Sequence, residues 1–157
     1  MGDLTSELGI NRPSLYAAYG DKEQLFHEVL SHYHETVTAS DRLTVASAEC
    51  AKDLVQQLLA SCVARISGHQ FSPGYLMSGA MADLSCLSEG LVSDITERLT
   101  GFEEQTADRY ESFGVALEEA QQRAAKLVFI ITGLSTYARS IPDPAKPSRM
   151  ANSFTRE

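Results

Sequence analysis

Residues 4–26 read LTSELGINRPSLYAAYGDKEQLF, and the organisation of the whole chain follows from this stretch. Leu4 and Leu8 are four residues apart, which places both on one face of a short helix. Gly9 follows directly and is able to take the positive φ of a helix C-terminus. We therefore expect a short helix that ends at a glycine turn.

The next residues predict a second short helix and the start of a longer one. Asn11 is a good N-cap, and Pro13 falls in the first turn, where a helix tolerates proline. Gly20 closes this helix, and Asp21 with Gln24 forms a variant of the capping box that opens the next. Two short helices joined by a glycine turn are the layout of a helix-turn-helix motif, whose second helix enters the major groove of DNA.

The same stretch resembles the signature of the tetracycline-repressor (TetR) family of transcriptional regulators. The matching elements are Leu-Gly-Ile, then Leu-Tyr, an aromatic residue, Asp-Lys-Glu and Leu-Phe, all at the family's spacing. The resemblance implies a repressor, a homodimer that binds near-palindromic double-stranded operator DNA. It also implies a C-terminal helical domain that dimerises and binds a small apolar or amphipathic molecule, which releases the DNA.

Carried over residue by residue, the resemblance implies a DNA-contacting set. This set comprises Asn11, Arg12, Pro13 and Ser14 facing bases and phosphates, the Tyr16 hydroxyl on a phosphate, and Lys22 on a phosphate. The residue types suit the task, because short polar groups and N–H groups at a helix start favour anions and arginine reads guanine or grips phosphate. The expected small core of the motif is Leu4, Leu8, Ile10, Leu15, Tyr19, Leu25 and Phe26.

Two departures from the family pattern leave a second hypothesis open. The family has one further helix before this motif, so we expect residues 1–37 to form a partial head that shares its last helix with a ligand-binding and dimerisation domain over residues 38–157. Residues 1–35 are also acidic, with a net charge of −4 from Asp3, Glu7, Asp21, Glu23, Glu28 and Glu35 against Arg12 and Lys22. The alternative is a dimeric ligand-binding module that has lost DNA binding.

The rest of the chain is predicted to be all-α. Apolar residues recur at steps of three and four from Leu54 to Ile66 and from Leu91 to Phe113. A third helix over residues 117–140 is apolar around most of its circumference, so we expect it to be buried on one side and to meet a partner subunit on the other. Pro142, Pro144 and Pro147 should then end regular structure, leaving at most one or two frayed turns in residues 148–157.

Composition excludes several classes of protein. With 157 residues, 17.1 kDa and 43% hydrophobic residues, the chain fits one domain, or one domain with a small module. The net charge of −8 excludes a nucleic-acid binder that is basic over its whole surface. The longest apolar run, residues 127–131, is too short for a membrane span, and no export signal is visible. Three widely spaced cysteines suit a reducing cytoplasm.

No residue pattern predicts an enzyme, a cofactor or a metal site. His27 and His32 are five residues apart, so they point about 140° away from each other on a helix and cannot share one metal. A hydrophobic thiol is the expected role of Cys62, whereas Cys86 is the better candidate for a reactive one. Residues that line a ligand cavity, or that are ordinary core, are Cys62, Tyr75, Met77, Met81, Phe102, Tyr110, Phe113 and Phe129.

Overall fold

The computed structural model is helical, with no strand in the part of the chain it describes: residues 5–7, 9–67, 76, 80, 87–138, 143 and 145–155. Its helices are α2 (Arg12–Tyr19), α3 (Lys22–Ser47), α4 (Ala51–Ser67), α6 (Glu89–Ser112), α7 (Leu117–Ala138) and α8 (Lys146–Phe154). The predicted all-α fold is confirmed. None of the described helices is long and apolar enough to cross a membrane. Leu4 and Leu8 lie outside the described residues.

The caps and turns between α2 and α3 form as the sequence predicts. The Asn11 side chain accepts a hydrogen bond of 2.8 Å from the Ser14 N–H, which caps α2. Asp21 Oδ1 accepts from the Gln24 N–H at 2.9 Å, and Gln24 Oε1 accepts from the Asp21 N–H at 3.0 Å, which completes the capping box. Gly20 between the two helices has a φ of +75°, a conformation that side chains disfavour. These local bonds fix the angle at which α2 leaves α3.

The main core lies where α4 meets the C-terminal part of α3, α6, α7 and α8. The faces of α4 and α6 predicted from helical spacing are confirmed as buried or half-buried. Fully buried large side chains in this core include Leu54, Leu58, Leu59 and Cys62. Each buried leucine contributes about 1.5–3 kcal/mol relative to an exposed one. The helices of the bundle therefore have one common apolar centre.

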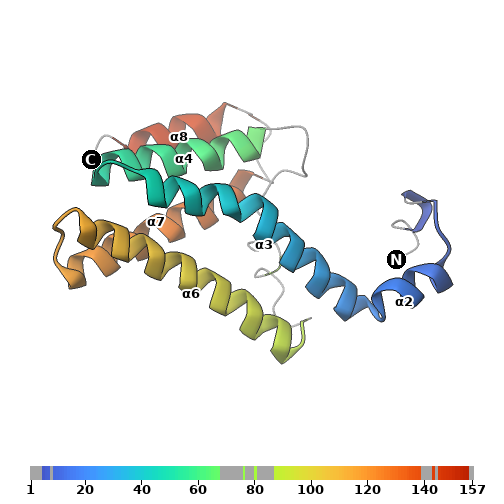
Figure 1. Ribbon diagram of the computed structural model, residues 1–157. Helices are drawn as coiled ribbons and strands as arrows, with labels where there is room; N and C mark the ends of the chain where they lie inside the picture. The colour runs from blue at the N-terminus through green and yellow to red at the C-terminus, as the bar shows by residue number, and fades with distance from the viewer. Residues whose placement is uncertain are drawn as a thin grey trace.

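Helices α6 and α7 form an antiparallel hairpin, seen along the lower side and behind it in Figure 1. Its turn contains Gly114 at a φ of +84°. A second, smaller core joins the N-terminal half of α3 to α6 through Leu30, Leu91 and Ile95. Beside it, the Ser88 hydroxyl donates to the Glu23 carboxylate. The N-terminal half of α3 is thus attached mainly to α6.

Two expectations for apolar residues near the N-terminus need correction. Ile10 and Tyr19 are 39% and 46% exposed, although the family pattern places both in the core of the motif. Leu15 is buried as expected, and Leu25 and Phe26 are half-buried. The reason is that α2 packs chiefly on α3, so only its Leu15 face is covered.

The C-terminal residues form a helix, so the expectation of frayed turns after the prolines is wrong. Helix α8 has nine residues, and Pro147 lies in its first turn instead of ending regular structure. A proline is tolerated there because the N–H it lacks has no partner within a helix. Pro147 and Ala151 are buried, and Met150 and Phe154 pack against the main core. Helix α8 thereby covers α4.

Candidate nucleic-acid interface and ligand cavity

The N-terminal end of α2 presents an exposed polar surface. Asn11, Arg12, Pro13 and Ser14 are all exposed, and Tyr16 is 42% exposed. Free N–H groups and the helix dipole make such an end attractive to an anion. Leu15, within the same turn, is 1% exposed and holds the helix on α3. The polar residues therefore face away from the molecule on a fixed support.

Lys22 is exposed at the start of α3, across the Gly20 turn from the end of α2. Together with Arg12, it gives this end of the molecule two positive charges. The neighbouring carboxylates are engaged within the fold, because Asp21 caps α3 and Glu23 accepts from Ser88. Figure 1 shows α2 at the far end of α3, beyond the bundle formed by α4, α6, α7 and α8. The residues expected to contact DNA lie at this projecting end.

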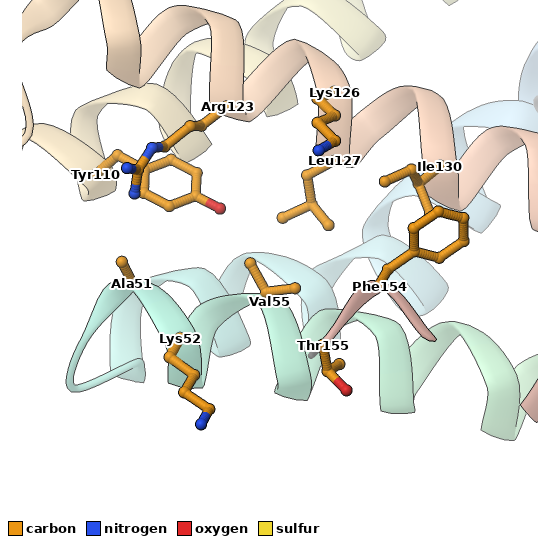
Figure 2. Close-up of a pocket in the computed structure, with 10 residues that line it drawn as sticks. All are labelled: Ala51, Lys52, Val55, Tyr110, Arg123, Lys126, Leu127, Ile130, Phe154 and Thr155. Atoms are coloured by element: carbon orange, nitrogen blue, oxygen red, sulfur yellow. The ribbon is translucent and has the colours of Figure 1, made fainter. Parts of the chain in front are cut away.

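A cavity of 460 Å³ lies at the opposite end of the molecule, between α4, α6, α7 and α8 (Figure 2). It is lined by Ala51, Lys52, Val55, Tyr110, Arg123, Lys126, Leu127, Ile130, Phe154 and Thr155. Its size falls in the range of small-molecule sites. Tyr110 is 2% exposed, and this burial raises the pKa of its hydroxyl, an effect that Arg123 partly offsets.

Of the residues expected to line a ligand cavity, the structure brings only Tyr110 to this one among those it describes. Phe102 lines a smaller cavity of 270 Å³ between α3 and α6, and Phe113 is half-buried with the Arg109 guanidinium 4.8 Å from its ring centre. Phe129 is 79% exposed and lines neither cavity. The predictions for Tyr75, Met77, Met81 and Cys86 fall outside the described residues.

Cys62 lies inside the main core, away from both cavities. Its Sγ is 3.5 Å from the Ser135 hydroxyl and 3.8 Å from the Ile131 carbonyl oxygen. Burial raises the pKa of the thiol, with the Ser135 hydrogen bond acting in the opposite direction. A protonated, buried thiol packs as a small hydrophobic group. Among the described residues, no group of three or more His, Cys, Asp or Glu is placed to hold a metal ion.

Solved structures of the same architecture include two of the TetR family transcriptional regulator CifR. Both are cysteine-substituted forms complexed with a 26-base-pair operator DNA, the first together with apo-CifR. The first has a TM-score of 0.84 and 25% identity over 99% of this chain and 84% of the CifR chain. The second has a TM-score of 0.82 and 26% identity over 98% and 82%. The chain has the fold of TetR-family regulators.

A third similar structure is a proposed TetR transcriptional regulator from Rhodococcus sp. RHA1, with a TM-score of 0.67. It is 25% identical over 99% of this chain and 85% of its own. No protein-family model matches the sequence, and no curated protein matches it either. The similarity to the TetR family therefore depends on the shared architecture together with the helix-turn-helix stretch.

The cavity contains residues that sequence reasoning missed, above all Lys52, Arg123 and Lys126. One face of α7 carries four of the lining residues, because they follow each other at steps of three, one and three: Arg123, Lys126, Leu127 and Ile130. This spacing could have shown that the apolar face of the helix carries two cations. It could not have shown that Lys52 and Val55 of α4 lie across from them.

Proposed function

We propose that this chain is a transcriptional regulator that binds double-stranded operator DNA as a homodimer and represses transcription. A small-molecule effector in the helical bundle would release the DNA, and the protein would act in the cytoplasm. The observation that carries the proposal is the exposed polar N-terminus of α2 on a helix-turn-helix whose Leu15 is buried. Complexes of CifR with operator DNA support it.

Each exposed residue of this end has a role that suits DNA. Insertion of the start of α2 into the major groove would bring Arg12 to a guanine or a phosphate. The Ser14 hydroxyl and the Arg12 N–H would each donate to a phosphate. The Tyr16 hydroxyl and the Lys22 ammonium would each contact a phosphate from the side. Asn11 is already committed to capping α2, so its part is to hold the helix start in shape.

Homodimerisation would use the outer face of α7. Phe129 on this face is 79% exposed, the most exposed of the large apolar side chains that the structure describes. Gly133 and Thr136 are exposed further along the same face, and Gly133, which has no side chain, would allow a second helix to approach closely. Two copies of one patch related by a two-fold axis form a closed dimer. Such a dimer would present two heads to two operator half-sites.

Effector control requires a connection between the bundle and the head. Helix α3 provides one, because it runs without a break from the head to the main core. The polar contacts of Glu23 with Ser88, and of Ser31 with Arg98, join its N-terminal half to α6. An effector that favours one arrangement of α6 and α7 would shift α3 and change the spacing of the heads. Coupling of this kind is worth about 1–3 kcal/mol.

Fluorescence anisotropy with labelled DNA from upstream of the gene, at two salt concentrations, tests DNA binding. We expect binding that weakens as salt rises, because phosphate contacts release counterions. In Arg12→Ala with Lys22→Ala, the slope of log affinity against log salt should fall by up to about 3.6, since the two heads of the dimer lose up to four phosphate contacts and each contributes about 0.9. The matched control is Lys146→Ala with Arg149→Ala on α8, which removes the same charge far from the head and should leave the slope unchanged.

The second candidate function is a dimeric ligand-binding module without DNA binding. The net charge of −4 over residues 1–35 and the exposure of Ile10 and Tyr19 favour it. Absence of binding at low salt, on several upstream fragments, would contradict the regulator and support the module. Equal loss of affinity in the head variant and in the α8 control would show that the binding is non-specific.

A further inference from the structure

The lining of the 460 Å³ cavity has an unusual charge for this protein. The chain carries a net charge of −8, yet Lys52, Arg123 and Lys126 contribute three positive charges to the cavity. None of the described lining residues carries a carboxylate. A cavity with one sign of charge and apolar walls focuses its electrostatic potential and attracts the opposite charge. The lining therefore favours an anion.

Two of these cations are available for a new partner. Arg123 pairs with Glu119 at 2.6 Å on the surface of α7, where the two side chains are 47% and 55% exposed. A pair this exposed contributes little to stability, so the guanidinium can exchange Glu119 for a ligand at small cost. Lys52 makes no hydrogen bond or ion pair with any residue that the structure describes. In Figure 2 it lies on α4, and its ammonium points away from Arg123.

The cavity is polar at one end and apolar at the other. In Figure 2, Arg123, Lys52 and the Tyr110 ring lie toward one end, and Ile130 and Phe154 toward the other. Arg123 and Ile130 are seven residues apart on α7, which corresponds to about 10 Å along the helix. Val55 and Leu127 line the space between the two ends. A ligand that fills the cavity would thus need a charged head and an apolar body.

We infer that this cavity binds an amphiphilic anion, namely a carboxylate with a single alkyl chain. Its carboxylate would accept from the Arg123 guanidinium, with Lys52 and Lys126 adding positive charge to the same cavity. Its alkyl chain would lie along Val55 and Leu127 and end against Ile130 and Phe154. The inference rests on the proposed function in one respect, that this ligand is the effector. Binding itself is measured without DNA.

Isothermal titration calorimetry with decanoate tests the binding site, and decyltrimethylammonium is the matched probe because it has the same alkyl chain with the opposite charge. We expect decanoate to bind at least tenfold more tightly than the cation. In Lys52→Met with Arg123→Met, decanoate affinity should fall at least tenfold while the affinity for the cation does not fall. Lys146→Met with Arg149→Met removes two charges outside the cavity and should leave decanoate binding unchanged. Circular dichroism of both variants checks that they are folded.

Two results overturn the inference: decanoate that binds no more tightly than the cation, and equal weakening in the cavity variant and the α8 control. Adding decanoate to the anisotropy experiment then separates this inference from the proposed function. If decanoate binds in the expected pattern but does not release DNA, the ligand class stands and the effector role is wrong. If decanoate does not bind while DNA does, the inference is wrong and DNA binding stands.

Discussion

His34 on α3 is held in its neutral form by two neighbours on the same face of the helix. The Arg42 guanidinium lies 2.6 Å from Nε2, and because arginine only donates, this nitrogen must accept. The Thr38 hydroxyl lies 3.2 Å from Nδ1 and donates to the His34 carbonyl oxygen, so its oxygen is free to accept from Nδ1–H. The geometry thus assigns the single ring proton to Nδ1.

This environment predicts that the protein loses stability in mild acid. Burial lowers the pKa of His34 below its ordinary value of 6.5, and the charges of Arg98 and Arg42 add to this, against the opposite effects of Asp94 and Glu35. The unfolded chain therefore takes up the proton more readily than the folded one. The free energy of unfolding is at its full value above pH 6.5 and falls below it, by at most about 1.4 kcal/mol per pH unit.

Urea unfolding at several pH values measures this dependence in the wild type and in His34→Gln, which keeps a polar side chain but cannot titrate. We expect a shallower decline below pH 6.5 in the variant. His32→Gln is the matched control, since His32 is exposed on the same helix and the substitution should leave the decline in place. Parallel pH curves for the wild type and His34→Gln would contradict the prediction.

At the scale of elements, helices α3 and α4 are joined by a buried ion pair. Arg65 Nη1 lies 2.7 Å from Asp41 Oδ1, and the two side chains are only 20% and 6% exposed. The Ser61 hydroxyl donates to the same carboxylate oxygen at 2.9 Å. Burial alone would lower the pKa of Arg65, but the Asp41 carboxylate reverses this and raises it. The guanidinium is therefore charged in the folded protein and depends on Asp41.

Removing the carboxylate should therefore destabilise the bundle strongly. We expect Asp41→Asn to lower the free energy of unfolding by about 3–5 kcal/mol, because it removes the carboxylate charge that offsets the burial of the Arg65 guanidinium. The exposed pair of Glu119 and Arg123 supplies the matched control, and Glu119→Gln should cost less than about 1 kcal/mol. Chemical denaturation of the three proteins compares these values, and similar small losses in both variants would show that the buried pair is unimportant.

Helical spacing predicts which side of each element is buried, but it does not predict which elements meet. The apolar positions of α4 from Leu54 to Ile66 are enough to define its core face, since residues three and four apart always share one side of a helix. Asp41 and Arg65 are 24 residues apart and on different helices, so only the packed structure brings them together. The prediction that Pro147 ends regular structure was wrong for a related reason. A proline is tolerated in the first turn of a helix but interrupts a helix interior, and local spacing does not tell the two apart.

At the scale of the whole molecule, the exposed face of α7 predicts a dimer that a single charge can break. Phe129→Lys places an ammonium where the second copy would pack, and we expect the dimer dissociation constant to rise at least tenfold. Leu43→Lys is the matched control, because Leu43 is 70% exposed on α3 and away from this face. Analytical ultracentrifugation over a range of concentrations gives both constants, and a monomeric wild type would exclude the dimer.

The residues of the candidate DNA interface were largely predictable from the sequence, whereas those of the cavity were not. The interface comes from one short stretch of the chain, and the cavity comes from distant segments. Arg12, Ser14, Tyr16 and Lys22 lie within one short stretch, so local caps and turns determine where they point. The cavity has walls from four helices between Ala51 and Thr155 along the chain. Only Tyr110 was expected there, and Phe129 lies on the surface because the outer side of α7 is left uncovered.

The unbroken helix α3 also has a mechanical consequence. Its 26 residues make a rod about 39 Å long, with the head at one end and the apolar centre of the bundle at the other. A tilt of about 5° at the bundle would swing the far end by roughly 3 Å, which is comparable to the rise of one base pair, about 3.4 Å per strand. In a two-fold dimer both rods swing together and the displacement doubles. Because the rigid helix amplifies a small rotation, a sub-ångström adjustment beside a ligand would change the spacing of the two heads enough to alter DNA binding.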